Sequence, residues 1–463
     1  MPYFNIARLH AAFAKSGLST RATCPRQHRR QRDSQPVASG VLSHHLTTKH
    51  CYMNEGEHPH RRWAVLSGLF FVYMASNGVT LHTLPLLYPE LMETFGWKES
   101  EVTLPATIFF LVGALTSPPA GWLLDRYSSR AIIAIGSLLL SLGLMAYSAT
   151  QSLWQLVAVY ALLGLALSLC GLVSNMVMLT SWFAAGRGRA TGILLMASSL
   201  GGAVFPLLVG NGLEHLGWRH TVLYAGLGVG LLMLGSAWLL LRHGRRSPQR
   251  VASPHTTDNP SVTLLSALAE RRFYAIVFTT GSLWFIIIAL TQHQSIFLAR
   301  DVGLDRSLLP SVFSLFFGSS VVGKLVFGLL SDRFNLHRVM ACAVMLLAAS
   351  LVLLSQMTAT DTALLYCYAM LAGVGFSGAF TCIQILVAAH YSGPHYGRIL
   401  AVVILIDTLF GALGTQTIAL VRESQGHYVT AFIGMSLLAA ASALIVLRLS
   451  TPLEEQTEPD QLG

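Results

Sequence analysis

The sequence predicts an all-α membrane protein with twelve spanning helices arranged as two six-helix pseudo-repeats. The first observation behind this prediction is composition: of 463 residues, 53% are hydrophobic and 11% are charged, with a mean hydropathy of +0.57. Soluble globular chains carry about 25% charged residues, so this balance indicates a chain that lies in a bilayer. The second observation is a repeated motif, and the third is the placement of the positive charges.

Twelve apolar stretches are each long enough to cross a bilayer, which takes about 20 mostly apolar residues in a helix. Their predicted bounds are 64–88, 103–124, 131–149, 153–179, 190–211, 220–241, 273–297, 308–330, 339–357, 363–389, 399–421 and 428–447. A polar, basic stretch rich in Pro, Ser and Thr separates the sixth from the seventh. We therefore expect one half at 63–241, a flexible cytoplasmic linker at 242–272, and a second half at 273–449.

A Gly-x-x-x-Asp-Arg motif occurs at residues 121–126 and again at residues 328–333, an offset of 207 residues. Each copy stands where an apolar stretch meets a short basic loop. One copy would indicate only a turn, but two copies at equivalent places indicate a duplicated membrane protein. Substrate sites in such duplications usually lie where the halves meet, so the repeat points toward transport.

Positive charge is distributed unequally between the two sides of the predicted topology. With the N-terminus in the cytoplasm, 24 of the 30 Lys and Arg residues fall inside, 5 fall outside, and Lys324 lies within a span. Cytoplasmic loops of membrane proteins carry an excess of Lys and Arg, so both termini are assigned to the cytoplasmic side of a cell (inner) membrane. Topology thus accounts for the net charge of +9, and we expect no nucleic-acid partner.

The two ends of the chain are expected to be cytoplasmic tails, at residues 1–62 and 450–463. Two interpretations of the first 52 residues remain open. Apolar residues interleaved with Arg8 and Lys15 are compatible with a weak amphipathic helix of transit-peptide type. Alternatively, translation starts at Met53 and the first 52 residues are not translated, which is the interpretation we favour.

The two motif copies resemble the signature loops of the major facilitator superfamily, over roughly Arg62 to Leu449. The resemblance implies the major facilitator fold and a conformational role for the motif. The residues concerned are Gly121, Asp125, Arg126, Arg130, Gly328, Asp332 and Arg333. Glycine allows close helix contact, the aspartate can pair with an arginine or a helix N-terminus, and the arginines reach lipid phosphates.

The signature usually has a second glycine three residues after its aspartate, where this chain has Ser128 and Asn335. Asparagine tolerates a left-handed backbone better than serine does, so we expect the turn to differ between the halves.

Finer features resemble the monocarboxylate and oxalate/formate branch of that superfamily. They are Phe95-Gly96-Trp97 and the stretches 186–193, 217–219 and 323–328. This resemblance implies a secondary active transporter that moves a small organic anion, a monocarboxylate coupled to protons, by alternating access. The helix 5 motif of drug exporters is poorly matched by residues 201–206, and efflux of a hydrophobic drug or metabolite remains the alternative.

Two charged residues lie well inside predicted spans, Lys324 in the eighth and Asp407 in the eleventh. A charge at mid-membrane costs about 2.5–3.5 kcal/mol on insertion scales, so each is a functional hypothesis. In the resembling branch a basic residue at the Lys324 position contacts the substrate carboxylate, with an acid one turn earlier, where this chain has Ser320. We hypothesise that Lys324 binds the anion, and that Asp407 carries a coupling proton or holds Lys324 when the site is empty. The competing interpretation is that Lys324 snorkels to the interface and Asp407 pairs structurally.

Four neutral polar residues complete the predicted site. His82 and His293 lie near the outer ends of the repeat-related first and seventh spans, where a histidine can sense or relay protons. Asn77 and Gln384 are candidate polar contacts of a cavity. The competing interpretations are interfacial histidines without a role and amides that serve helix packing.

Other classes of protein are disfavoured. An enzyme would need a catalytic cluster such as paired acids at one interface, and the sequence has none. No Gly-x-x-x-x-Gly-Lys-Ser/Thr motif is present, so an ion or solute gradient is expected to supply the energy. Neither cysteine nor histidine spacing indicates a metal site, and no cofactor is expected. The expected partners are the small-molecule substrate, protons and membrane lipids, with the protein acting as a monomer.

Overall fold

The computed structural model describes residues 59–183, 187–239, 264–391 and 396–449, which are helical apart from short connections. Eleven helical stretches among them are long and apolar enough to cross a membrane. One stretch, Arg189–Leu239, is long enough for two of the predicted spans. Gly217, with φ 70° and ψ 166°, breaks it into two helices, which brings the number of spans to twelve. Glycine adopts such a backbone at no steric cost. The prediction of an all-α protein with twelve spans is therefore confirmed.

The first half begins with an irregular span. The helices of this half are α2 (Pro59–Asn77) continued by η1 (Gly78–Thr83), η2 (Leu84–Leu87) and α3 (Tyr88–Phe95), then α4 (Glu99–Arg126), α5 (Ser129–Ser148), α6 (Leu153–Cys170), α7 (Leu172–Trp182) and α8 (Arg187–Leu239). A π-helical turn, η1, is followed by a 3-10 turn, η2, which starts beside Pro85. Proline lacks a backbone donor, and π-helical turns occur frequently at functional sites.

The second half repeats this plan. Its helices are α10 (Arg271–Ile296) continued by η3 (Phe297–Asp301), then η4 (Arg306–Leu308) with α11 (Leu309–Arg333), α12 (Leu336–Ser355), α13 (Thr362–His390), α14 (Tyr396–Gln425) and α15 (Val429–Arg448). Part of the predicted flexible linker is helical: α9 (Leu264–Ala269) is a short run of helix formers with Ala267 buried. Residues 242–263 of that linker lie outside the described residues, as do residues 1–58 of the N-terminal tail predicted at 1–62 and the C-terminal tail predicted at 450–463. Residues 59–62 of the predicted N-terminal tail belong to α2.

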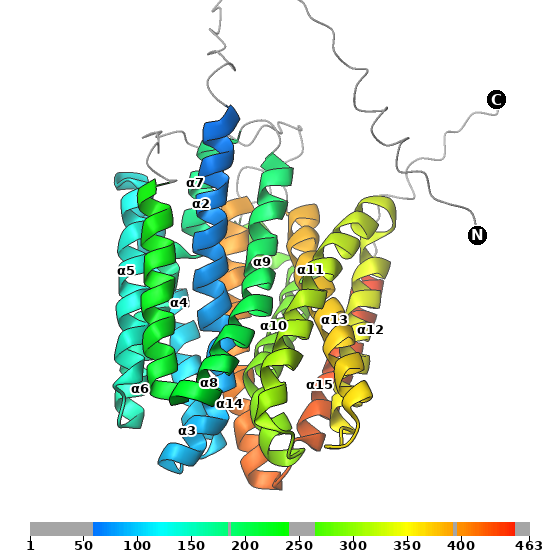
Figure 1. The fold of residues 1–463 in the computed structure, drawn as a ribbon. Helices are drawn as coiled ribbons and strands as arrows, with labels where there is room; N and C mark the ends of the chain where they lie inside the picture. Colours follow the sequence, from blue (N-terminus) through cyan, green and yellow to red (C-terminus); the bar gives the residue numbers. More distant parts are fainter. Residues whose placement is uncertain (1–58, 184–186, 240–263, 392–395, 450–463) are drawn as a thin grey trace, which may run out of the picture. The chain divides into compact units, whose positions relative to one another are not determined.

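Helix packing repeats from one half to the other. In the first half α2 packs on α8, α4 on α6, and α5 on both α6 and α8. In the second half α10 packs on α14, α11 on α13, and α12 on both α13 and α15, which are the equivalent pairs. The halves meet where α8 packs on α11 and α4 packs on α14 (Figure 1). These two contacts exchange places when the halves are exchanged, as the duplication in the sequence requires.

Glycines allow the closest helix crossings. A Cβ built on Gly201 of α8 would lie 2.9 Å from the Cα of Gly78 on η1. On the next residue, Gly202, a Cβ would lie 2.8 Å from the Cβ of Phe317 on α11. Small residues let backbones approach in lipid, where no water drives helices together. One turn of α8 thus seats both a helix of its own half and a helix of the other half.

The two motif copies define one end of the bundle, here called the motif end, and the other end is called the opposite end. The expected difference between the two turns after the motif is wrong, because both turns have nearly the same backbone geometry and neither is left-handed. Ser128 has φ −64° and ψ 123°, and Asn335 has φ −56° and ψ 118°. Each residue is instead the extended N-cap of the next helix, and Asn335 Oδ1 accepts hydrogen bonds from the backbone N–H groups of His337 and Arg338.

Candidate functional site

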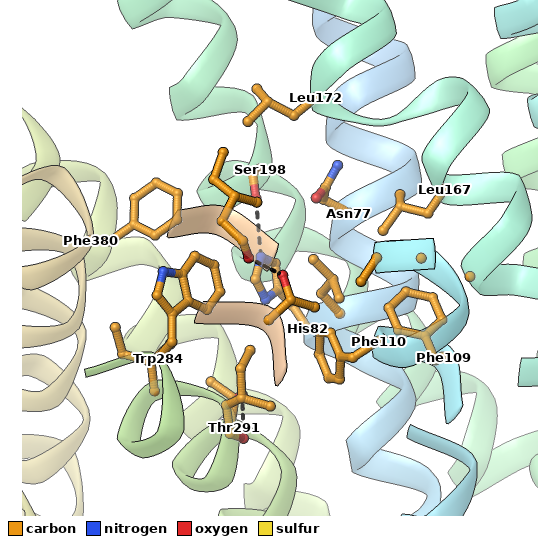
Figure 2. A pocket seen from close by; sticks show the side chains of 18 of the residues that line it. Asn77, His82, Phe109, Phe110, Leu167, Leu172, Ser198, Trp284, Thr291 and Phe380 are labelled. Atoms are coloured by element: carbon orange, nitrogen blue, oxygen red, sulfur yellow. Dashed lines mark hydrogen bonds between the residues drawn. The ribbon is translucent and has the colours of Figure 1, made fainter. Parts of the chain in front are cut away.

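A cavity of about 300 Å³ lies between the two halves. Its walls come from the first span, α4, α6, α7 and α8 on one side and from α10, α11, α13 and α14 on the other. Four of the predicted site residues line it, namely Lys324, His82, Asn77 and Gln384. Figure 2 shows His82 near the middle of the view, with Trp284 and Phe380 on one side of it and Phe109 and Phe110 on the other.

Lys324 is the only Lys, Arg, Asp or Glu among the described residues that line the cavity. It lies nine residues, about 13 Å, from the end of α11 at Arg333. Its Nζ donates a hydrogen bond of 3.1 Å to the carbonyl of Leu195 on α8, and lies 5.4 Å from the ring centroid of Phe380. An ammonium has three N–H donors, so two remain for a ligand.

His82 lies deeper in the bundle than the sequence predicted. The first span continues through α3 to Phe95, so His82 is not near the outer end but beside the cavity. Its Nε2 shares a hydrogen bond of 3.1 Å with Ser198 Oγ on α8, and its ring centroid lies 3.9 Å from that of Phe317. Its buried Nδ1 has no hydrogen-bond partner among the described residues. His82 therefore presents a polar atom at the junction of the two halves.

The two predicted amide side chains, Asn77 and Gln384, differ in how far their hydrogen-bonding groups are already used within the protein. Asn77 is 6% exposed, and its Nδ2 donates to the carbonyl of Tyr73 at 3.2 Å and to Ser76 Oγ at 3.2 Å. These bonds lie within one helix, so Asn77 lines the cavity but mostly satisfies its own helix. Gln384 lines the cavity one turn after Phe380 on α13, on the side toward the motif end.

Asp407 does not line the cavity, although Ile404 and Thr408 on the same helix do. The carboxylate is 2% exposed, and its Oδ1 accepts a hydrogen bond of 2.7 Å from the hydroxyl of Thr280 on α10. It lies eleven residues, about 16 Å, from the start of α14, a depth similar to that of Lys324. The predicted pairing of Lys324 with Asp407 is nevertheless absent from this structure, because each bonds to a different neighbour.

His293 lies outside the cavity and is fully buried among α10, α14 and the start of α15. Its Nε2 lies 2.7 Å from the carbonyl of Thr415, which can only accept, so Nε2 carries the proton. Its Nδ1 then accepts from the hydroxyl of Tyr428 at 2.9 Å. With both ring nitrogens engaged away from the cavity, His293 ties three helices together and does not reach a ligand there.

The motif residues lie at the motif end, away from the cavity. Arg130 Nε donates to the carbonyl of Ala237 at 2.9 Å and Nη2 to that of Trp238 at 3.3 Å, so it caps the C-terminus of α8. The guanidinium of Arg126 lies 4.2 Å from the ring centroid of Trp122. The side chain of Asp125 is outside the described ones.

The glycines of the motif face open space in this conformation. A Cβ on Gly121 or on Gly328 would meet no atom of the described residues within 4 Å. Asp332 and Arg333 of the second copy are exposed. The close helix contact expected at Gly121 is therefore not made here.

The opposite end is closed by bonds between the halves. Tyr88 Oη donates to Gln292 Oε1 at 2.6 Å, and Ser295 Oγ donates to the carbonyl of Pro85 at 2.5 Å. All of these side chains are buried. Gln292 also lines the cavity, so this layer forms the end of the cavity on that side. Sequence reasoning missed Tyr88, because a tyrosine at the end of a span is equally typical of a membrane interface.

A second layer of contacts lies further toward the opposite end. Arg306 pairs with Glu90 at 2.8 Å and also with Glu93. The backbone N–H of Ser100 donates to Glu423 at 2.8 Å. These side chains are partly exposed. Together the two layers separate the cavity from the opposite end.

Access to the cavity is from the motif end. On that side Leu172, Val173 and Ile404 line the cavity and are 39%, 44% and 45% exposed. On the other side Thr291 and Gln292 are 5% and 3% exposed. A site between two repeats that is open at one end and sealed at the other is one of the two states that alternating access requires.

The chain matches the family model of the Major Facilitator Superfamily over residues 65–297 and 294–462. It belongs to that superfamily. The protein is accordingly an integral, multi-pass membrane transporter and not an enzyme, as the sequence predicted.

Relatives in the superfamily are distant. The chain is 28% identical over 370 residues to the MFS-type transporter opdF of Penicillium oxalicum, which covers 76% of this chain and 82% of the relative. It is 27% identical over 404 residues to Monocarboxylate transporter 13 of Bos taurus, and the alignment covers 83% of this chain and 89% of the relative. It is 25% identical over 336 residues to the Agnestins efflux protein AgnL12 of Paecilomyces divaricatus, and the alignment covers 71% of this chain and 74% of the relative.

A solved structure shares the fold. It is a bacterial homologue of the human lysosomal transporter Spinster in an inward-facing, occupied conformation, with a TM-score of 0.65 and 16% identity, covering 85% of this chain and 97% of that one.

Proposed function

We propose that this transporter moves a small organic anion, a monocarboxylate together with a proton, by alternating access. The observation that carries the proposal is that Lys324 supplies the only formal charge among the described side chains that line the cavity. A lysine inside the membrane is costly and typically marks a substrate or ion pathway. An ammonium with two free N–H donors in an otherwise neutral cavity favours an anion over a cation. The similarity to Monocarboxylate transporter 13 supports the same class.

Asp407 is the proposed proton carrier. An unpaired buried carboxylate is costly, and a bound proton removes that cost. Asp407 is 2% exposed, receives one hydroxyl hydrogen bond from Thr280, and has no ion-pair partner among the described residues. Because Ile404 and Thr408 on the same helix line the cavity, a change at the cavity wall reaches Asp407 through α14.

The motif end is proposed to be cytoplasmic, since the excess of Lys and Arg lies there. This structure is then the inward-open state. In the outward-open state we expect the motif end to close, with Gly121 and Gly328, which face open space here, packed against neighbouring helices. One chain contains both halves and the cavity, so a monomer is the proposed transport unit.

The alternative function, efflux of a hydrophobic drug or metabolite, is favoured by the aromatic side chains that line the cavity and by the similarity to the Agnestins efflux protein. The two proposals differ in one respect that can be tested. The first needs the positive charge of Lys324, and the second does not.

The test is a thermal-unfolding screen of the purified protein with carboxylates and with lipophilic cations, at acidic and at neutral pH. The best carboxylate is then followed in proteoliposomes with an imposed pH gradient. We expect Lys324→Gln to abolish binding of the carboxylate. We expect Asp407→Asn to retain exchange of carboxylate for carboxylate but to lose uptake driven by the pH gradient.

Lys98→Gln is the matched control, because Lys98 is an exposed lysine at the opposite end. Stabilisation by lipophilic cations alone, or carboxylate uptake that survives Lys324→Gln, would refute the anion proposal. Uptake by Asp407→Asn that still follows the pH gradient would refute the proton role.

A further inference from the structure

Two aromatic walls face each other across the cavity. In the first half, Phe109 and Phe110 on α4 lie edge to face, with ring centroids 5.2 Å apart at 87°. In the second half, Trp284 on α10 and Phe380 on α13 lie 5.8 Å apart at 70°. All four line the cavity, and Figure 2 shows one pair on each side of it. The aromatic lining therefore comes from both halves.

Lys324, the only charged side chain among the described residues that line the cavity, lies beside one of these walls. Lys324 Nζ is 5.4 Å from the ring centroid of Phe380, and Trp284 packs on the same ring. A carboxylate that binds Lys324 consequently has its attached carbon atoms directed along an aromatic surface. An acidic head and an apolar body are thus recognised by adjoining groups.

Four hydroxyls of the cavity lining are already hydrogen-bonded to other groups of the protein. Ser168, Thr291 and Thr408 each donate to a carbonyl of their own helix, at 2.8 Å, 3.0 Å and 2.7 Å. Ser198 is engaged with His82. A sugar-like substrate would have to displace these bonds, whereas an apolar body leaves them intact.

The cavity is larger than a short carboxylate requires. Its volume of about 300 Å³ is that of about ten waters at roughly 30 Å³ each. Acetate has only four non-hydrogen atoms and would leave most of the aromatic surface in contact with water. A single-ring aryl-alkyl carboxylate occupies more of the volume than acetate does, and its ring can stack or meet the walls edge to face.

We propose that the cavity selects an amphipathic carboxylate, whose aromatic ring packs between the walls formed by Phe109, Phe110, Trp284 and Phe380 while its carboxylate contacts Lys324. This inference rests on the proposed function, because it takes the anion site at Lys324 as given. It goes beyond that function by assigning the body of the substrate to the aromatic walls.

The experiment compares three probes on the purified full-length protein by calorimetry: phenylacetate, acetate, and 2-phenylethanol, which keeps the ring and lacks the charge. We expect phenylacetate to bind at least about tenfold more tightly than either of the others, since even one methylene in a hydrophobic pocket changes discrimination by about 10-fold or more. Trp284→Leu and Phe110→Leu should each weaken phenylacetate binding by about tenfold and change acetate binding by less than about twofold.

Two further variants keep the outcome clear. Trp284→Phe retains an aromatic wall and should retain most of the preference for phenylacetate, which separates loss of the ring contact from loss of folding. Phe71→Leu, at an exposed position on α2, is the control for removing a ring elsewhere.

The possible failures are distinguishable. If acetate binds as tightly as phenylacetate and both need Lys324, the aromatic selectivity is refuted and the anion transporter stands. If 2-phenylethanol binds as tightly as phenylacetate, or if Lys324→Gln leaves phenylacetate binding unchanged, the anion site itself is refuted.

Discussion

Removing the hydroxyl of Tyr88 should shift this transporter toward the state that is open at the opposite end. In the structure Tyr88 is fully buried and donates a 2.6 Å hydrogen bond to Gln292, which is 3% exposed, across the interface of the halves. Tyr88→Phe keeps the ring and leaves Gln292 Oε1 without its partner. A buried acceptor left unpaired costs about 1–3 kcal/mol. That cost falls on the closed state, so the ratio of open to closed should rise by about 5- to 150-fold.

Distances between spin labels measure this shift, and the measurement does not depend on which end of the protein is cytoplasmic. Labels at Ser152→Cys and Thr360→Cys, in exposed loops of the two halves at the opposite end, would report separation there in a background without native cysteines. A population at longer distance should grow in Tyr88→Phe. Tyr391→Phe is the control, since that buried hydroxyl lies at the end of α13, away from the opposite end, and has no hydrogen-bond partner among the described residues. Equal distance distributions in wild type and Tyr88→Phe would show that this bond does not hold the opposite end closed.

Three smaller predictions follow from the same contacts. Arg306→Gln breaks partly exposed ion pairs worth about 1 kcal/mol or less, so its effect on the same distances should be smaller than that of Tyr88→Phe, and high salt should reproduce it in the wild type. Gly201→Ala forces a Cβ against the first span and should lower the thermal stability by about 1–3 kcal/mol, whereas Gly192→Ala, which meets open space on the same helix, should be neutral or stabilising in a thermal-unfolding assay. Arg130→Gln removes a cation from the C-terminus of α8 and should cost about 0.3–1 kcal/mol in the same assay.

The membrane-spanning helices could be predicted from the sequence, because hydropathy over twenty residues is a local property. It was also sufficient for Lys324 as a cavity residue, because an intramembrane charge is rarely placed without a function. It placed His82 too near the outer end, since nothing in the hydropathy shows that the first span continues through a π-helical and a 3-10 turn to Phe95. Rotation of a helix about its axis depends on packing, which is why sequence alone put His293 in the site. For the same reason the sequence could not show that Asp407 bonds Thr280; it predicted that Asp407 either carries a coupling proton or holds Lys324.

Packing also explains which residues went unnoticed. Tyr88, Trp284 and Phe380 are ordinary apolar or interfacial residues as far as the sequence shows. Their importance arises from neighbours in the other half or on other helices, more than a hundred residues away for the Tyr88 bond. Pairwise geometry of this kind has no local signature.

Gly217 gives the two spans of α8 a joint of a single residue, without a loop between them. The first of these spans carries Leu195, which holds Lys324, and the second ends at the carbonyls that Arg130 caps. A joint this short keeps the adjoining ends of the two spans next to each other. We therefore expect a displacement at Lys324 to reach the basic loop at the membrane surface through both spans. Lengthening this joint by a few flexible residues would leave both contacts intact and yet disconnect them mechanically.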